Sequence, residues 1–512
     1  MTDADPSARF NAETVRAHGD GEPDAARASE LNDIAEQVAR QYRADSMSPV
    51  IVSGVLRLVE FGLLTAIGLV AFVAYVGIRT HLFWYYPAVT LGGSTLMVII
   101  LELADAYQQN ALRRPFSQTG RILFSWLGVF AVLALIGFFL KVSADFSRIW
   151  FGTWFLGGFL ALVVLRFFLA KIIRKWARNG KMERRALIVG GGKTAEALIR
   201  SIEMQPENDI RICGIFDDRD DVRSPPVVAG YPKLGTIGEL IEFARIARID
   251  MLIVAMPLIA EARVLTLLKR LWVLPVDIRL SAHSNKLQFR PRSYSHIGSV
   301  PMLDIFDRPI NDWDSVAKRA FDIFFSLLGI IFLSPIMLIT AIAIKLDSAG
   351  PVLFRQQRHG FNNEVIDVLK FRSMYTDQTD ALARKVVTKG DPRVTRVGRF
   401  IRKASIDELP QFFNALRGEL SLVGPRPHAV YAQMQERMFS DVVEGYFARH
   451  RVKPGVTGWA QINGWRGEID EDEKIMKRTE FDLYYIENWS LMFDLKILFL
   501  TPFKLLNTEN AY

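Results

Sequence analysis

The stretch IFFSLLGIIFLSPIMLITAIAI, residues Ile323–Ile344, decides on which side of a membrane the rest of the chain lies. Its 22 uncharged residues are enough for a helix to cross about 30 Å of hydrocarbon. Ser334 and Pro335 stand at its middle, and a proline inside a helix removes a hydrogen bond and clashes one turn back. Because both flanks are basic, we expect a helix that breaks at Ser334-Pro335 and returns to the same headgroups. A fifth, Pro-kinked span is the alternative.

Four more uncharged apolar runs precede this stretch. Each has 17 to 20 residues: Phe61–Ile78, Leu82–Leu101, Ile122–Leu140 and Ile149–Leu165. So many runs of this length in one short region argue against soluble core helices and predict a four-helix transmembrane bundle over residues 49–178. Arginines gather after the second run (Arg113, Arg114, Arg121) and again after the fourth, whereas the loop after the first run holds only Arg79. The positive-inside rule therefore places both ends of the bundle in the cytoplasm.

The composition excludes several classes of protein. The 512 residues are 50% hydrophobic and contain one cysteine, which excludes a disordered chain and an internal disulfide. The net charge of +8 is uneven, because residues 1–48 carry ten acidic and five basic residues without an apolar period. We expect a flexible cytosolic tail there, with a short helix over Ser29–Arg43. The basic remainder holds no nucleic-acid-binding motif, so no nucleic acid is expected as a partner.

Residues 179–302 have the pattern of a soluble α/β domain. The apolar strand Ala186–Val189 runs into three glycines and an amphipathic helix, and a second predicted strand ends at Asp217. This is the G-x-G-x-x-A pattern of a Rossmann-like fold, in which Gly190 and Gly192 would approach a nucleotide phosphate and Asp217 a ribose. The same glycines can serve only the tight turn of a scaffold, and we favour that reading because no catalytic constellation accompanies them.

The C-terminal third holds a pair of adjacent acids, Asp407 and Glu408. Basic residues stand around them in the sequence: Arg355, Arg358, Lys370, Arg372, Arg393, Arg396, Arg399, Arg402, Lys403, Arg426 and Lys453. Many cations near two carboxylates imply a polyanionic substrate, usually a phosphate, and carboxylates with phosphates suggest Mg²⁺. A carboxylate can also attack phosphorus as a nucleophile. The simpler alternatives are an acidic helix start favoured by the helix dipole and arginines that bind lipid headgroups.

Six motifs then make a family resemblance specific. In chain order they are KRAFD (318–322), GPVLFRQQR (350–358), KFRSM (370–374), SIDELPQ (405–411), SLVGPRP (421–427) and VKPGVTGWAQ (452–461). Through them residues 313–512 resemble the bacterial sugar transferase domain, the catalytic unit of monotopic phosphoglycosyl transferases. With the apolar runs and the Rossmann-like region, the whole chain resembles the large polyprenyl-phosphate sugar phosphotransferases, nearest to the undecaprenyl-phosphate glucose phosphotransferases.

The resemblance implies an architecture. The chain would be a multi-domain membrane protein with a four-helix transmembrane bundle, a Rossmann-like α/β cytosolic domain and a mixed α/β catalytic domain over residues 303–512. The catalytic domain would carry a re-entrant membrane helix over residues 318–346, broken at Ser334-Pro335. It would lie in the bacterial inner membrane as a multi-pass protein, with its soluble domains and both termini in the cytoplasm. A homodimer is compatible with this arrangement.

The resemblance also implies a reaction. A sugar-1-phosphate, glucose-1-phosphate before others, would pass from a UDP-sugar to undecaprenyl phosphate with release of UMP, the first membrane step of exopolysaccharide, capsule or O-antigen repeat-unit assembly. Asp407 would be the nucleophile that carries the sugar-phosphate, and Glu408 would bind Mg²⁺. The phosphate-binding candidates are Arg426, Pro427 and Arg402, followed by Arg355, Lys370, Arg372 and Lys453. The alternatives are a galactose or N-acetylhexosamine donor, or a membrane-anchored nucleotide-binding sensor.

Overall fold

The chain divides into two compact units, Asp45–Arg184 and the remainder. The computed structural model describes residues 31–43, 48–77, 83–108, 111–112, 115–142, 145–178, 183–204, 210–219, 223–256, 261–281, 294–297, 300–376, 391–428, 433–434, 437–438, 443, 446–465, 467 and 472–505. Residues 1–30 of the expected tail and the loop residues Arg79, Arg113 and Arg114 lie outside these ranges.

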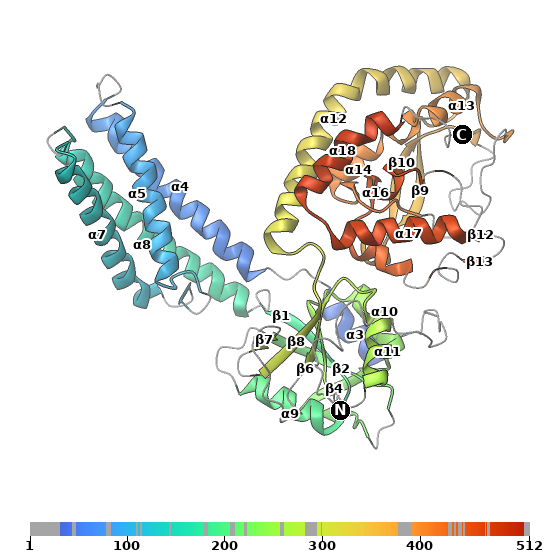
Figure 1. Ribbon diagram of the computed structural model, residues 1–512, viewed down its shortest axis with the longest axis horizontal. Helices are drawn as coiled ribbons and strands as arrows, with labels where there is room; N and C mark the ends of the chain where they lie inside the picture. The colour runs from blue at the N-terminus through green and yellow to red at the C-terminus, as the bar shows by residue number, and fades with distance from the viewer. Residues whose placement is uncertain are drawn as a thin grey trace, which may run out of the picture. The chain divides into compact units, whose positions relative to one another are not determined.

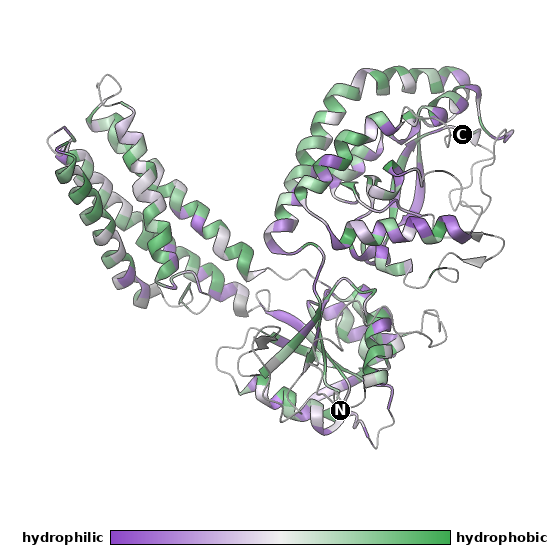
Figure 2. Ribbon diagram, in the orientation of Figure 1, coloured by the Kyte–Doolittle hydropathy of each residue, from purple (hydrophilic) through white to green (hydrophobic). Residues whose placement is uncertain are grey.

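Four long helices make up the unit Asp45–Arg184: α4 (Pro49–Tyr75), α5 (Tyr85–Leu103), α7 (Pro115–Phe139) and α8 (Arg148–Arg178) (Figure 1). Each contains most of one predicted apolar run, and Figure 2 shows apolar residues along most of their length. Trp126, Trp150 and Trp154 are fully buried between them. Glycines allow this packing, since a Cβ on Gly158 would lie 2.8 Å from the ring of Trp126.

Five helices, these four and α12 (Asp312–Asp347), are long and apolar enough to cross a membrane. At most a third of the most apolar window of each is buried within the protein. Because such large apolar surfaces are unfavourable in water, the chain is a membrane protein.

An eight-stranded sheet in the order β3-β4-β2-β1-β5-β6-β8-β7 forms the α/β domain. Its elements are β1 (Arg184–Val189), α9 (Gly192–Glu203), β2 (Ile210–Phe216), β3 (Val227–Val228), β4 (Tyr231–Gly235), α10 (Ile237–Ile246), β5 (Met251–Val254), α11 (Glu261–Leu271), β6 (Asp277–Ser281), β7 (Tyr294–Ile297) and β8 (Val300–Phe306). Strands β1, β5 and β6 pair in parallel, as a Rossmann-like core requires, and β8 and β7 continue the sheet antiparallel. Since β8 ends at Phe306, the domain extends past the predicted boundary at residue 302.

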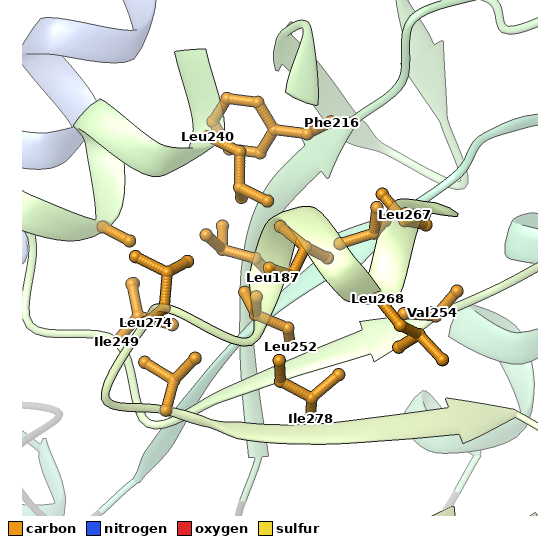
Figure 3. Close-up of a cluster of buried hydrophobic side chains, with 14 of the residues drawn as sticks. Leu187, Phe216, Leu240, Ile249, Leu252, Val254, Leu267, Leu268, Leu274 and Ile278 are labelled. Carbon is orange, nitrogen blue, oxygen red and sulfur yellow. The ribbon is translucent and has the colours of Figure 1, made fainter. Parts of the chain in front are cut away.

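Alternate residues of the central strands enter two separate cores. Leu187 and Val189 of β1 pack with α10 and α11, whereas Ala186 and Ile188 pack with α9. Figure 3 shows the first core, where Leu187 and Leu252 meet side chains such as Leu240. This alternation follows from the two-residue period of a strand and explains why both faces of the sheet are covered.

A helix from the N-terminal segment packs on the same domain. Helix α3 (Asp33–Gln41) starts at Asn32, whose side chain accepts a hydrogen bond from the amide of Ala35. Ala35 and Ala39, four residues apart, are fully buried against the first core. The short predicted helix is therefore confirmed, but it is docked rather than part of a flexible tail.

The transferase region begins with α12 and folds around it. The elements that follow are β9 (Leu353–His359), η1 (Phe361–Asn363), β10 (Val365–Phe371), α13 (Arg396–Lys403), η3 (Ile406–Glu408), α14 (Gln411–Arg417), β11 (Ser421–Val423), β12 (Gln433–Met434), β13 (Arg437–Met438), η4 (Tyr446–Arg451), β14 (Gly455–Thr457), α16 (Trp459–Ile462), α17 (Asp472–Glu487) and α18 (Leu491–Leu505). Pro335 lies inside α12, and the helix bends without losing its continuity, which differs from the expected break (Figure 1).

Pro335 divides α12 into a first arm, residues 312–334, and a second arm, residues 336–347. Both arms pack on the same region of the protein. In the first arm, Gly329 allows close approach of the Phe412 ring of α14. In the second arm, Ile344 is buried with Phe371 and Ile401. The two ends of this apolar helix are therefore tied to one folded body.

The short helix η4 joins the transferase region to the α/β domain. Ala448 of η4 is fully buried in the first core of the α/β domain. Next to it, Arg451 donates a hydrogen bond of 2.8 Å to the carbonyl of Asp307, in the linker after β8. The two regions thus share part of one hydrophobic core.

Candidate active site

The acid pair lies on a tight turn between α13 and α14. Ser405, directly before η3, adopts a left-handed backbone conformation with φ of 56°. Such a conformation is unfavourable for a residue with a side chain, and it is found most often beside functional residues. Ile406 and Leu409, on either side of the pair, pack against the second arm of α12. Apolar packing against the membrane helix therefore holds the turn in place.

Glu408 is held by two cations. Arg426 donates from Nη2 to Oε1 at 2.6 Å and from Nη1 to Oε2 at 3.0 Å, and Lys370 donates from Nζ to Oε1 at 2.9 Å. Burial opposes ionisation of this carboxyl, but Arg426 and Lys370 outweigh it and hold the pKa of Glu408 well below its usual range. Glu408 is therefore a fixed anion that orients both cations.

Asp407 is in a different state. Its side chain is buried, with 9% of the residue exposed. Burial raises the pKa of Asp407 to about 6 against the opposing charge of Lys370, and the negative charge of Glu408 raises it further. Arg402 and Arg426 lower it by smaller amounts. A carboxylate whose pKa is raised by burial is poorly solvated when it ionises, which is a suitable state for a nucleophile.

The strands β9 and β10 separate two arginines that are close in sequence. In the antiparallel ladder Arg358 lies opposite Ile366 and Arg355 opposite Leu369, so the two arginines point to opposite faces. Arg358 shares the face of Lys370 and donates to the carbonyl of Pro427. Arg355 is on the exposed face. Both arginines of the GPVLFRQQR motif were among the cations expected around the acid pair, and Arg355 was the predicted phosphate ligand. The structure instead brings Arg358 close to both acids.

Two other predicted phosphate ligands are used elsewhere. The guanidinium of Arg372 donates to the carbonyls of Ser348 and Ala349, so it caps the C-terminal end of α12. Lys453 donates to the carbonyl of Gly418, at the end of α14, with a distance of 2.7 Å. Both residues complete helix ends. Lys370 and Arg426 bind Glu408, Arg402 acts on Asp407 through its charge, and the carbonyl of Pro427 accepts a bond from Arg358.

A second layer of residues supports Arg426, and the sequence had not indicated it. Arg449 is fully buried and pairs with Asp482 at 2.5 Å. It also donates to the backbone carbonyl of Arg426 at 2.8 Å and contacts the ring of His428. Asp482 is more than fifty residues from Arg426 in sequence, so only knowledge of the tertiary fold could have grouped them.

The glycine turn of the α/β domain is closed by the chain itself. Asp217 accepts a hydrogen bond of 2.6 Å from the amide of Gly191 and another of 2.6 Å from Arg219. A Cβ on Gly191 would lie 2.1 Å from Oγ of Ser224, and one on Gly192 would lie 2.8 Å from the carbonyl of Arg223. Residues 223–224 therefore lie against the turn where a nucleotide phosphate would bind.

Comparison with known proteins places these features in a family. A family model described as bacterial sugar transferase matches residues 313–508, and one described as CoA-binding domain matches residues 102–282. The chain is 41% identical to the undecaprenyl-phosphate glucose phosphotransferase of Komagataeibacter xylinus over 65% of its own length and 61% of that protein. It is 37% identical to the UDP-glucose:undecaprenyl-phosphate glucose-1-phosphate transferase of Escherichia coli, over 80% of its length and 86% of that protein.

A third relative has a different donor in its name. It is the UDP-N-acetylgalactosamine-undecaprenyl-phosphate N-acetylgalactosaminephosphotransferase of Aeromonas hydrophila, 45% identical over 36% of this chain and 42% of that protein. The acid pair, Lys370 and Arg426 all lie inside the residues that the sugar transferase model matches. The chain is therefore a transferase and belongs to the bacterial sugar transferase family, among the undecaprenyl-phosphate sugar phosphotransferases.

Proposed function

We propose that this enzyme transfers glucose-1-phosphate from UDP-glucose to undecaprenyl phosphate and releases UMP. The observation that carries the proposal is the contrast within the acid pair. Glu408 is bound by Arg426 and Lys370, whereas Asp407 is buried beside the same cations with a raised pKa. Two neighbouring carboxyls in different environments have different tasks. Here Asp407 is the nucleophile, and it faces a phosphate-binding cluster.

The chemistry follows in two displacements. In the first, an oxygen of Asp407 forms a bond to the β-phosphorus of the UDP-sugar, and the bond from that phosphorus to the bridging oxygen breaks, so that UMP leaves with the electron pair. In the second, a phosphate oxygen of undecaprenyl phosphate attacks the same phosphorus and the Asp407 carboxylate leaves. Arg426, Lys370 and Arg358 would stabilise the charge on the phosphoryl oxygens.

Mg²⁺ is part of the proposal, and the residues present fit it only together with substrate. Among the described residues no group of three or more His, Cys, Asp or Glu side chains could hold a metal ion. Three of the acceptor positions of Glu408 are used by Arg426 and Lys370, which leaves one on Oε2. Glu408 and Asp407 would supply one or two ligands and the diphosphate the rest, as is usual for Mg²⁺. The ion would neutralise charge on the diphosphate.

We also infer that α12 is re-entrant and that the soluble domains and both termini lie in the cytoplasm. What supports this is the packing of both arms of α12 on one region, because a straight span would separate its two ends by the thickness of the membrane. Cysteines in place of exposed Asp314 and Lys345, in a Cys213→Ala background, should both react with a membrane-impermeant maleimide from the cytoplasmic side. Labelling from opposite sides would contradict the hairpin.

The reaction is tested with UDP-glucose labelled with ³²P at the β-phosphate. The detergent-purified protein should become labelled without lipid acceptor, in an amount equal to the UMP released, and should lose the label when undecaprenyl phosphate is added. UMP release without label on the protein would contradict the covalent route but not the overall transfer. A panel of UDP-glucose, UDP-galactose and UDP-N-acetylhexosamines would then establish the donor, which the relatives' names leave between these classes.

A further inference from the structure

We propose that Tyr485 and the buried ion pair Lys318–Asp494 are positioning residues for Arg426. They hold the strand β11 that precedes Arg426, and they connect this strand to the first arm of the membrane helix. The inference rests on the proposed function only in that Arg426 is taken to act on the diphosphate. It assigns a task to three residues that do not touch the acid pair themselves.

Two of the three side chains, Lys318 and Tyr485, reach the carbonyl oxygen of Val423, and Asp494 bonds to both of them. Lys318 of α12 donates to it from Nζ at 3.0 Å and to Oδ2 of Asp494 at 2.6 Å. The hydroxyl of Tyr485 donates to Oδ1 of Asp494 at 2.7 Å and lies 3.0 Å from the same carbonyl. Lys318, Asp494 and Tyr485 come from α12, α18 and α17, so one polar network beside the last residue of β11 joins three helices.

The other end of β11 is fixed by the same membrane helix. Asp322, one turn after Lys318, accepts hydrogen bonds from Oγ of Ser421 at 2.9 Å and from the amide of Leu422 at 3.0 Å. All three residues of β11 are buried. The strand is therefore held along its whole length by polar contacts with α12.

The chain has little freedom between Val423 and Arg426. A Cβ on Gly424 would lie 2.5 Å from the carbonyl of Lys453, so the backbone there is in close contact with its neighbour. Pro425 has a fixed φ angle. A displacement of the Val423 carbonyl would therefore be passed on to Arg426, whose two bonds to Glu408 need a defined position and orientation.

The network has features of a positioning device. A buried ion pair is weak as a source of stability, because the loss of hydration offsets most of the attraction. Lys318 and Asp494 are nevertheless 8% and 0% exposed. Their hydrogen bonds fix one backbone carbonyl at a defined place, which apolar side chains of the same size would not do.

The test compares Tyr485→Phe with Thr479→Val. The first removes the Tyr485 hydroxyl beside the Val423 carbonyl and keeps the ring. The second removes a buried hydroxyl of the same helix, whose hydrogen bond goes to the carbonyl of Ile475. With UDP-glucose and undecaprenyl phosphate, Tyr485→Phe should lower kcat/KM roughly 10-fold, because a small misplacement of a phosphate ligand weakens the transition state. Thr479→Val should stay within about twofold of the wild-type protein.

A double-mutant cycle separates positioning from a structural role. If Tyr485 acts through Arg426, then Tyr485→Phe should have almost no further effect on kcat/KM in an Arg426→Lys background. Independent effects that multiply would overturn the inference. The variant Lys318→Met/Asp494→Leu keeps the volume of both side chains but also takes a cation from buried Asp322, so its Tm is measured beside its activity. It should lose activity. Wild-type activity in this variant would equally contradict the proposal.

The outcome for the proposed function is distinguishable. If the wild-type protein released no UMP from any UDP-sugar, the proposed reaction would fail and the positioning role with it. If the wild-type protein were active and Tyr485→Phe were equally active, only the positioning role would fail.

Discussion

Two buried aspartates differ in role. Asp217 in the α/β domain stabilises a turn, whereas Asp407 in the transferase region is the proposed nucleophile. Asp217 accepts bonds from the amide of Gly191 and from Arg219. Burial opposes its ionisation, but these bonds hold its pKa below the ordinary value. Asp407 is buried too, yet burial prevails and its pKa rises to about 6.

The two sites differ in which carboxylate the neighbouring arginine binds. Arg219 binds Asp217 directly, and it also binds the carbonyl of Gly191, so it closes the turn. Arg426 binds Glu408 and acts on Asp407 only through its charge. The neighbouring glutamate thus takes up the cations and leaves the aspartate available. A direct salt bridge to Asp407 would have lowered both its pKa and its reactivity.

The largest expected effect is the difference in transfer activity between the variants Asp407→Asn and Asp217→Asn. Asp407→Asn should reduce transfer to below roughly one-thousandth of the wild-type rate, because it removes the proposed nucleophile. Asp217→Asn should leave kcat/KM within about twofold, since a closed turn takes no part in the reaction. UMP release and protein labelling measure both. Near-normal transfer by Asp407→Asn would show that another group attacks the phosphorus.

The second largest effect is the difference in activity between variants of Arg426 and Arg355. Arg426→Lys should lower kcat/KM by about 100-fold, because lysine cannot make the two parallel bonds to Glu408 and to phosphate. Arg355→Lys is the matched control, since Arg355 lies on the opposite, exposed face of the β9–β10 ladder. If both variants lost activity equally, the assignment of faces would be wrong.

The third effect is a dependence on pH. Because the proposed attack needs an ionised Asp407, kcat/KM should fall about tenfold per pH unit below the pKa of about 6 and be level above it. The raised pKa also means that Asp407 favours the folded state at low pH and loses that contribution as the pH rises through 6. The Tm of Asp407→Asn relative to the wild-type protein should therefore increase between pH 4 and pH 7. A constant difference would contradict the raised pKa.

The smallest effect is expected when a nucleotide is added to test the α/β domain, since we expect no change in Tm. Coenzyme A or NAD at millimolar concentration should leave the Tm of the wild-type protein unchanged, because residues 223–224 lie against the glycine turn. Asp217→Asn should lower the free energy of unfolding by roughly 1–3 kcal/mol through the lost bonds to Gly191 and Arg219. A clear rise of Tm with either nucleotide would show that the turn opens.

Much of the site could be predicted because its motifs are local. Asp407, Glu408 and Arg426 stand in short motifs whose residue order is visible in the sequence. The choice between Arg355 and Arg358 could not be made, since it depends on the register of β9 against β10. Arg372 and Lys453 were assigned by charge alone, and a basic side chain can cap a helix as well as bind phosphate.

The fold was predicted where a pattern repeats and missed where it does not. The apolar runs and the parallel strands have clear periods, so their bounds were close. The antiparallel strands β7 and β8 and the docking of α3 depend on distant partners, and no local pattern indicates them. The network around Val423 includes a bond between Lys318 and Asp494, which are 176 residues apart, and this is beyond any motif.

The burial of Ala448 in the core of the α/β domain has a consequence for how the protein unfolds. Regions that share a hydrophobic core lose it together, so the α/β domain and the transferase region should melt in one cooperative transition. A truncated protein that begins after Phe306 would expose the apolar face of η4 to water. We therefore expect the α/β domain to stabilise the transferase region through this contact, whether or not it binds a ligand.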